Sequence, residues 1–253
     1  MPLTTFAGGR LFGVRHGHDR PWVLALHGWQ RSHGDFASVL ESLDAVALDL
    51  PGFGAAPEPP AGWSPADYAN WVAPVLDELA ERPVVLGHSF GGRVAVHLAA
   101  THGARVGAVV LTGVPLVHAP GTRRRRPPIP FRVGRTLRRA HLVSDSAMEA
   151  LRQRYGSADY RNARGVMRQV LVKAVGEDGG YGELLAAYPG PIELVWGADD
   201  TAAPVAGAET ALGFCRQGRL CVVTGVDHFT PRHAVAELRA ALERHRPESS
   251  PAK

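Results

Sequence analysis

The feature that most restricts the fold of this chain is the alternation of short apolar runs with longer stretches of helical period. Several runs are apolar throughout, as strands buried on both faces of a parallel sheet tend to be. The alternation therefore predicts an α/β fold, in which a mostly parallel central sheet carries helices on both faces. The predicted strands cover residues 10–14, 22–26, 45–50, 83–86, 108–111, 192–196 and 219–223. The predicted core helices cover residues 35–43, 64–80, 90–101, 204–212 and 233–245, with Asp35 and Ser64 as N-caps and Pro65 in the first turn after Ser64.

The stretch from residue 115 to residue 188 interrupts the alternation, because it carries no strand signal. It opens with the turn-rich, charged sequence GTRRRRPPIPF and continues with helical patterns at residues 134–141, 145–155, 159–175 and 181–188. We expect this stretch to be a helical lid, inserted into a core made of residues 1–114 and 189–247. Residues 248–253 are expected to form a disordered tail.

Composition limits the class of protein. With 253 residues, of which 45% are hydrophobic, the chain can bury one sizeable core. No apolar run reaches the roughly 18 residues of a membrane-spanning helix, and the N-terminus lacks the pattern of an export signal, so we expect a cytoplasmic protein with no membrane contact. Cys215 and Cys221 cannot form a disulfide framework and are interpreted as small core residues. We expect no metal and no cofactor.

The strongest local signal is the sequence Gly87-His88-Ser89-Phe90-Gly91, which follows a predicted strand and precedes a predicted helix. In this context GxSxG predicts a tight turn in which the glycines avoid clashes and the serine hydroxyl is exposed. The start of the helix also favours negative charge on an attacking oxygen. Ser89 is therefore the predicted nucleophile. His88 is interpreted as a packing residue rather than a second base, because a strand-end neighbour of Ser89 is expected to point away from it.

A serine becomes nucleophilic at neutral pH only with a general base and an acid that orients this base. Both residue types appear after the last two predicted strands, as Asp199 and Asp200 and then as His228. Because the carboxyl ends of parallel strands meet at one edge of a sheet, Ser89, one aspartate and His228 can converge there. The order Ser, Asp, His along the chain predicts a catalytic triad.

In combination these motifs resemble the α/β-hydrolase superfamily, and the resemblance covers nearly the whole chain outside the predicted lid. It rests on HGW at residues 27–29, DLPGFG at residues 49–54, the turn around Ser89, GxxDxxxP ending at Pro204, and the block at His228. The HGW triplet and the helical lid are most similar to carboxylesterases such as the pimeloyl-carrier-protein methyl esterases. This chain has Asp227 where the family usually has glycine before the histidine, and such an acid is expected to favour the protonated imidazole.

The resemblance implies roles for further residues. Its GxxDxxxP spacing selects Asp200 as the acid that orients the base and leaves Asp199 as a loop residue. It also implies an oxyanion hole made by the backbone N–H groups of Trp29 and Phe90, and losing one such donor typically costs about 2.7 to 4 kcal/mol. The side chains of Trp29 and Phe53 are candidates for the substrate pocket, with core packing or turn formation as the alternative.

The predicted activity is that of a serine hydrolase, which cleaves a small-molecule carboxylic ester through an acyl-enzyme. Two alternatives use the same residues, namely carbon–carbon bond hydrolysis of a dienoic ketoacid and cofactor-free perhydrolysis. A ligand receptor on a hydrolase scaffold is a further alternative, which the intact triad disfavours. The sequence His16-Gly17-His18-Asp19 resembles a metal cluster, but it lacks a fourth ligand and is interpreted as a solvated loop between strands.

Positive charge is concentrated in the predicted lid. Residues 120–175 hold 14 Lys and Arg against three acidic residues, a balance of +11, whereas the whole chain carries +4 and its remainder therefore −7. The simplest interpretation is a solvated, arginine-rich surface. The alternatives are docking of an acidic carrier protein or attraction of an anionic substrate, with Arg123 to Arg126 as candidate contacts. Nucleic acid is not expected as a partner, because no binding motif or interleaved aromatic residues accompany these arginines.

Overall fold

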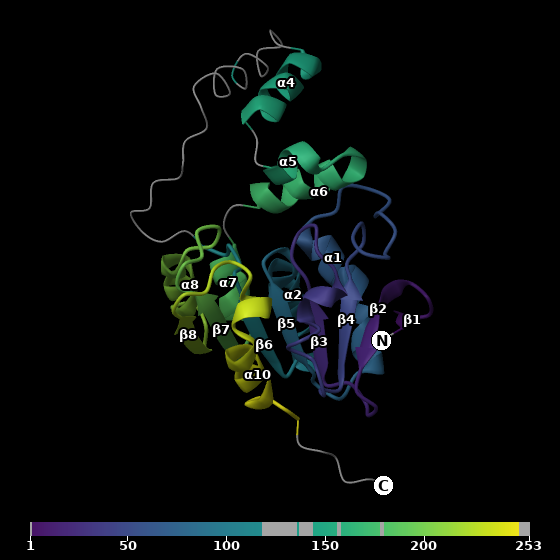
Figure 1. The fold of residues 1–253 in the computed structure, drawn as a ribbon, viewed down its shortest axis with the longest axis vertical. Helices are drawn as coiled ribbons and strands as arrows, with labels where there is room; N and C mark the ends of the chain where they lie inside the picture. The colour runs from purple at the N-terminus through teal and green to yellow at the C-terminus, as the bar shows by residue number, and fades with distance from the viewer. Residues whose placement is uncertain (1, 118–135, 137–143, 156–157, 178–179, 248–253) are drawn as a thin grey trace.

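A single eight-stranded sheet forms the centre of the computed structural model, which describes residues 2–117, 136, 144–155, 158–177 and 180–247 (Figure 1). The strands lie in the order β1-β2-β4-β3-β5-β6-β7-β8. β1 pairs with β2, and β2 with β4, in antiparallel fashion, whereas all the other neighbours are parallel. The strands are β1 (Leu3–Phe6), β2 (Leu11–His16), β3 (Val23–Leu26), β4 (Ala45–Asp49), β5 (Val84–His88), β6 (Ala108–Thr112), β7 (Pro191–Gly197) and β8 (Gln217–Val223).

All seven predicted strands are present, with ends shifted by one or two residues, and the predicted fold class is confirmed. β1, the outermost strand, was not predicted from the sequence. Its residues Leu3, Thr4 and Thr5 are exposed, so it has no apolar run that would signal a buried strand. Its partner β2 holds it through a register in which Leu3 faces Val14.

Two apolar clusters cover the two faces of the sheet. Successive residues of a strand point to opposite faces, so in β3 Leu24 and Leu26 join the first cluster while Val23 and Ala25 join the second. The first cluster packs against α1 (Pro65–Val72), α2 (Phe90–His102), α7 (Tyr181–Ala187) and α8 (Val205–Leu212). The second packs against α10 (Val235–Glu243) and the segment around Phe36. This two-sided burial explains why the parallel strands are apolar throughout.

Two predicted core helices are each divided into two shorter helices in the structure. Residues 64–80 form α1 and then the 3₁₀ helix η2 (Ala73–Glu78), because Pro74 lacks the N–H that a continuous α-helix needs. Residues 233–245 are covered by α9 (Thr230–His233) and α10. Another short 3₁₀ helix, η3 (Gly103–Arg105), follows α2.

The predicted helix at residues 35–43 is wrong, since only the 3₁₀ turn η1 (His33–Phe36) is present and Ser32, not Asp35, caps it. The guanidinium of Arg239 on α10 donates to the carbonyl oxygens of Val39 and Glu41. An α-helix over residues 35–43 would need the Val39 carbonyl for the N–H of Leu43, which donates to Leu40 instead. A tertiary contact from a distant part of the chain therefore replaces the local helix.

The insertion between β6 and β7 carries α4 (Asp145–Tyr155), α5 (Ala158–Asn162), α6 (Gly165–Gly176) and α7. The predicted helix at 159–175 is two helices, because the chain turns before Gly165, which has a φ of +52°. The predicted helix at 134–141 lies outside the described residues except for Thr136. Figure 1 shows α5 and α6 beyond the ends of the strands, above the middle of the sheet, whereas α7 packs on α2. The lid and its boundaries remain a prediction.

Other expectations concern the membrane, the tail and the cysteines. Within the described part of the chain, no helix is long and apolar enough to cross a bilayer. The tail at 248–253 falls outside the described residues. Cys215 and Cys221 are free thiols, each half-buried, rather than fully buried core residues.

The capping box of α1 gives a stability prediction. The Ser64 hydroxyl accepts the Asp67 N–H, and the Asp67 carboxylate accepts the Ser64 N–H at 2.8 Å. Ser64→Ala removes one side of this exchange and should lower the free energy of unfolding by about 1 kcal/mol, measured by urea denaturation. Ser38→Ala, at an exposed serine, is the matched control and should stay within about 0.5 kcal/mol of wild type. Equal losses in the two variants would contradict the capping role.

Candidate active site

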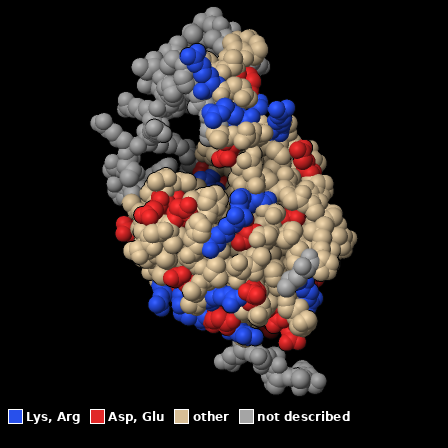
Figure 2. Space-filling model, in the orientation of Figure 1, with Lys and Arg blue, Asp and Glu red and all other residues tan. Residues whose placement is uncertain are grey.

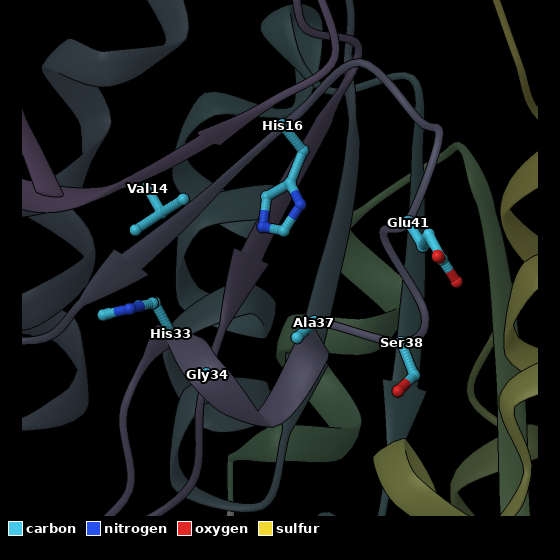
Figure 3. A pocket seen from close by; sticks show the side chains of 7 residues that line it. All are labelled: Val14, His16, His33, Gly34, Ala37, Ser38 and Glu41. Carbon is cyan, nitrogen blue, oxygen red and sulfur yellow. The ribbon is translucent and has the colours of Figure 1, made fainter. Parts of the chain in front are cut away.

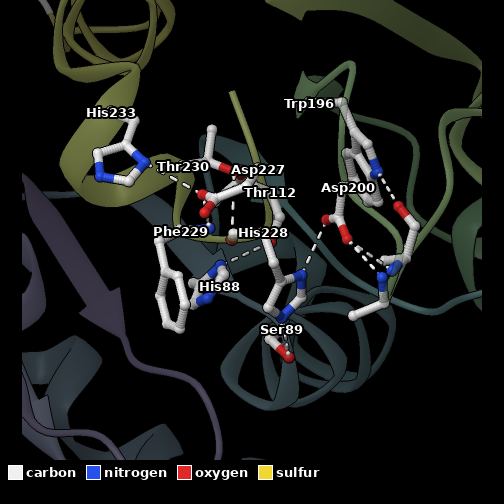
Figure 4. Close-up of polar contacts among 12 residues, drawn as sticks. His88, Ser89, Thr112, Trp196, Asp200, Asp227, His228, Phe229, Thr230 and His233 are labelled. Carbon is white, nitrogen blue, oxygen red and sulfur yellow. Dashed lines mark hydrogen bonds and ion pairs between the residues drawn. The ribbon is translucent and has the colours of Figure 1, made fainter. Parts of the chain in front are cut away.

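Three loops at the carboxyl edge of the sheet bring together Ser89, Asp200 and His228, which follow β5, β7 and β8. His228 Nε2 lies 3.3 Å from Ser89 Oγ, and His228 Nδ1 lies 2.8 Å from Asp200 Oδ2. Figure 4 shows the imidazole between the hydroxyl and the carboxylate. The arrangement can pass a proton from Ser89 to the imidazole while the carboxylate holds the other ring nitrogen.

The turn at Ser89 is strained. Ser89 has φ 50° and ψ −113°, a conformation that a residue with a side chain rarely adopts, and α2 begins at the next residue. A Cβ at Gly91 would collide with the carbonyl oxygen of Leu26, so only glycine allows α2 to approach β3 this closely. The predicted GxSxG turn is therefore present, with Ser89 at the start of the helix.

The adjacent acids Asp199 and Asp200 occupy different environments. Asp200 is 4% exposed, and its second oxygen accepts the N–H groups of Ala202 and Ala203 at 2.9 and 2.7 Å. These bonds and the His228 contact satisfy the buried carboxylate. Asp199 is exposed. The geometry thus brings Asp200, and not Asp199, to the imidazole.

Asp227, the departure from the family pattern, turns away from the imidazole of His228. Its carboxylate accepts the Phe229 N–H at 2.9 Å and lies 3.0 Å from His233 Nδ1. Half of its side chain is exposed to solvent. The acid therefore shapes the loop around His228 rather than forming a hydrogen bond with its ring.

The loop after β3 lies directly against the nucleophile. A Cβ added at Gly28 would stand 3.4 Å from Ser89 Cβ. Between the described residues, no hydrogen bond uses the N–H of Trp29 or of Phe90 as donor. The two predicted oxyanion donors are thus free for a ligand, on loops that meet beside Ser89. The loop is itself strained, because Gln30 has a φ of +54°.

An aromatic cluster lies next to these donors. The Trp29 ring is 5.0 Å from the Phe53 ring and 5.6 Å from the Phe90 ring, both edge to face. The Tyr68 ring also packs edge to face on Phe90, at 5.1 Å. Phe53 is 7% exposed, whereas Trp29 is half-buried. The cluster can present an apolar wall to a substrate, mainly through Trp29.

His88 is a residue whose contact the sequence analysis missed. It packs as expected, but it does not point away from the site, because its ring lies 5.0 Å from the His228 ring (Figure 4). Its Nδ1 is 3.1 Å from the Thr112 carbonyl oxygen. Burial, together with the charge of His228, lowers the pKa of His88 from 6.5 to about 4. His88 is therefore a neutral support for His228 at physiological pH, and only the GHS sequence hinted at it.

Charges at the rim of the site are largely paired. The Arg31 guanidinium donates two hydrogen bonds to the Asp35 carboxylate. It also lies 5.0 Å above the ring of Phe229, the residue after His228. Arg232 also contacts Asp35, at 3.3 Å. Figure 2 shows basic and acidic side chains interspersed over the described part of this face. Arg123 to Arg126, the predicted contacts of an acidic partner, lie outside the described residues.

A hollow of about 440 Å³ lies away from the triad. His16, which points into it in Figure 3, pairs with Ala45 at the start of β4, the opposite end of the sheet from Ser89. The solvated-loop interpretation holds for the exposed His18 and Asp19 but is wrong for His16, which is 5% exposed. Across the described ranges, no group of three His, Cys, Asp or Glu side chains could hold a metal ion. The hollow is lined by Val14, His16, His33, Gly34, Ala37, Ser38 and Glu41.

Comparison with known proteins identifies the family. Residues 23–241 match the model of the alpha/beta hydrolase family. The chain belongs to this family. The match includes β3 to β8 and all the residues that converge on Ser89.

Individual relatives of this chain are named for different activities. The chain is 29% identical, over 94% of its length and 67% of the relative's, to the dihydrolipoyllysine-residue acetyltransferase component of an acetoin cleaving system from Cupriavidus necator. It is 37% identical to an esterase of Mycobacterium tuberculosis, over 42% of this chain but only 37% of that protein. A pimeloyl-[acyl-carrier protein] methyl ester esterase of Vibrio parahaemolyticus is 35% identical over 36% of the chain and 35% of that protein.

Solved structures agree on the fold of this alpha/beta hydrolase. A thermophilic esterase from Thermogutta terrifontis superposes with a TM-score of 0.68, over 98% of this chain and all of that one. The identity between the two is 20%, so the likeness concerns the fold alone.

Buried neutral histidines make stability depend on pH. On unfolding, His88 regains its ordinary pKa of 6.5. Between about pH 6.5 and pH 4, the unfolded chain therefore binds a proton at this residue, whereas the folded protein does not. The free energy of unfolding should therefore fall by about 2 kcal/mol from this group between pH 7 and pH 5. Urea denaturation at both pH values should show a smaller fall for His88→Asn than for wild type. The exposed-site control His18→Asn should match wild type, and an unchanged fall in His88→Asn would contradict the neutral state of His88.

Proposed function

We propose that this protein is a serine hydrolase that cleaves a carboxylic ester through an acyl-enzyme. The observation that carries the proposal is the continuous line from Ser89 Oγ through His228 to Asp200, with contacts of 3.3 and 2.8 Å. The 3.3 Å contact is at the long end for a hydrogen bond, as is common before a substrate tightens the site. The triad, the oxyanion hole and the role of each residue are part of this proposal.

The reaction follows from the positions of the groups. Ser89 Oγ attacks the ester carbonyl carbon as His228 Nε2 takes its proton, and Asp200 stabilises the imidazolium that forms. The N–H groups of Trp29 and Phe90 receive the negative oxygen of the tetrahedral intermediate. The imidazolium then protonates the departing alcohol. A water molecule repeats the sequence on the acyl-Ser89 ester and releases the acid.

Ester hydrolysis in general is supported by the relatives, which include an esterase and a methyl ester esterase. Carbon–carbon hydrolysis of a dienoic ketoacid and perhydrolysis would use the same residues. Comparing the rates on p-nitrophenyl esters with the rates on such ketoacids distinguishes these activities from ester hydrolysis. A receptor role is disfavoured by the connected Ser89, His228 and Asp200. We further propose a cytoplasmic location.

An acidic carrier protein remains a proposed partner. The Vibrio relative is named for a methyl ester on an acyl-carrier protein, and residues 120–175 of this chain carry a balance of +11. Such a cluster would attract an acidic carrier over a distance of about 8 Å at physiological salt. A solvated surface is the simpler interpretation of the same arginines.

A fluorophosphonate probe tests the nucleophile. Ser89 in wild-type protein should be labelled in a one-to-one ratio, because His228 activates it and the helix start stabilises the adduct. Peptide mass spectrometry locates the label, and Ser89→Ala should stay folded and unlabelled. Labelling of any other serine would overturn the assignment.

Two neighbouring substitutions test the orienting acid. Asp200→Asn should lower kcat by about 10⁴-fold, because it removes the acceptor that selects the His228 tautomer and stabilises its charged form. Asp199→Asn, one residue earlier and exposed, is the matched control and should change kcat little. Steady-state rates on a p-nitrophenyl ester give both values. A larger loss in Asp199→Asn would show that the register is wrong by one residue.

A further inference from the structure

The imidazole of His27, fully buried between the end of β3 and the end of β4, has two hydrogen-bond partners of opposite kind. The N–H of Leu50 donates to His27 Nε2 at 3.0 Å, and His27 Nδ1 lies 2.7 Å from the carbonyl oxygen of Gly28. A backbone N–H can only donate and a carbonyl can only accept. Nε2 must therefore carry the lone pair and Nδ1 the hydrogen, so the two contacts admit one neutral tautomer.

The held carbonyl belongs to the peptide that carries a proposed oxyanion donor. The Gly28–Trp29 peptide is planar and trans, so the Gly28 C=O and the Trp29 N–H point in opposite directions. Fixing the carbonyl fixes the direction of the N–H. Because Gly28 lies against Ser89, this direction decides whether the N–H reaches an oxygen bound at the nucleophile.

The loop needs such a restraint. Gln30, two residues after Gly28, is held in the left-handed region at φ 54°, and such backbone persists only where neighbouring contacts determine it. The only other hydrogen bond to the Gly28 carbonyl within the described residues is from the N–H of Arg31, at the longer distance of 3.3 Å. The bond from His27 is thus the shorter of two that keep the peptide from flipping.

We propose that His27 is a positioning residue for the oxyanion hole, whose Nδ1–H holds the Gly28–Trp29 peptide so that the Trp29 N–H faces the substrate oxygen. The inference rests on the proposed function, since it presumes acyl transfer at Ser89. His27 touches no reacting atom. Its ring also meets Phe53 edge to face at 5.6 Å, but packing alone would leave the orientation of the peptide unspecified.

The ring remains in the required form at neutral pH. Burial lowers the pKa of His27 from 6.5 to about 4, against the opposing effects of the Gly28 carbonyl, Asp49 and Asp35, and His33 adds to the lowering. The neutral imidazole keeps its lone pair for the Leu50 N–H. At neutral pH the ring can therefore accept the Leu50 N–H at Nε2 while it donates its Nδ1–H to Gly28.

Two amide substitutions separate positioning from packing. Asn places an N–H near the position of Nδ1, whereas Gln places an oxygen near the position of Nε2, so His27→Asn can still hold the Gly28 carbonyl and His27→Gln can hold only the Leu50 N–H. His27→Gln should lower kcat on p-nitrophenyl butyrate by about 10²-fold with KM little changed, and His27→Asn should lose much less. His16→Asn, at another buried imidazole far from Ser89, is the control and should keep wild-type kcat.

The affinity for a trifluoromethyl ketone, which forms a tetrahedral anion on an active serine, gives a second readout. It should weaken in His27→Gln by the same factor as kcat. If the Asn and Gln variants lose kcat equally, in proportion to the fall in their melting temperatures, His27 has only a packing role and the inference is overturned. A wild-type protein that forms no ketone adduct would overturn the proposed function itself, whereas equal affinity in wild type and His27→Gln would overturn the inference alone.

A measurement on the unaltered protein covers variants that fail to fold. The ¹⁵N chemical shifts of the His27 ring, assigned by comparison with His27→Gln or by selective labelling, should show a neutral imidazole with its hydrogen on Nδ1 at pH 7. A hydrogen on Nε2 or a protonated ring would contradict the proposal, whatever the kinetics of the variants.

Discussion

The site depends on how closely the first turn of α2 approaches the end of β3. A side chain at Gly91 would meet the carbonyl oxygen of Leu26, and one at Gly28 would press on His88 at 3.0 Å. The sheet order reverses at this point, since the chain runs from β3 outward to β4 and then returns to β5 on the other side. A crevice opens beyond the carboxyl ends of strands at such a reversal. Ser89 follows β5 and Trp29 follows β3, the two neighbouring strands at which the order reverses.

Buried polar groups hold the loops around this crevice. The Asp49 carboxylate, 1% exposed, accepts the backbone N–H groups of His33 and Ala55 and contacts His33 Nδ1, all within 2.9 Å. Burial acts to raise the pKa of Asp49, but these hydrogen bonds outweigh it and hold the pKa below its ordinary value. The carboxylate thereby joins the loop that carries Trp29 to the turn that carries Phe53. Rigid loops matter because oxyanion donors stabilise a transition state only when they are already in place.

The sequence predicted the parts of the fold that depend on local patterns. Apolar runs located seven strands, Ser64 and Pro65 located the start of α1, and GxSxG located the turn at Ser89. The misses have tertiary causes. Arg239, about 200 residues away, replaces the helix expected at 35–43, and β1 is an exposed edge without an apolar run.

The candidate site shows the same division. The GxxDxxxP pattern of the family that the sequence resembles selected Asp200 over its neighbour, and this carboxylate does contact His228. The contact of His88 with His228, in contrast, depends on side-chain directions at a strained strand end. The tautomer of His27 likewise depends on the N–H of Leu50, the residue that follows β4. Motifs therefore locate the groups, whereas the packing of strand ends decides which groups touch.

The central claim is that Ser89 carries the acyl group during turnover. Its most direct test is intact-protein mass spectrometry of the enzyme quenched in acid while it hydrolyses p-nitrophenyl butyrate, followed by peptide mapping. We expect one butyryl group per chain, located on Ser89. If deacylation is the slower step, this group forms together with a burst of p-nitrophenol equal in amount to the enzyme. Steady hydrolysis with the butyryl group on another residue would contradict the claim, and so would full activity in variants that lack Ser89.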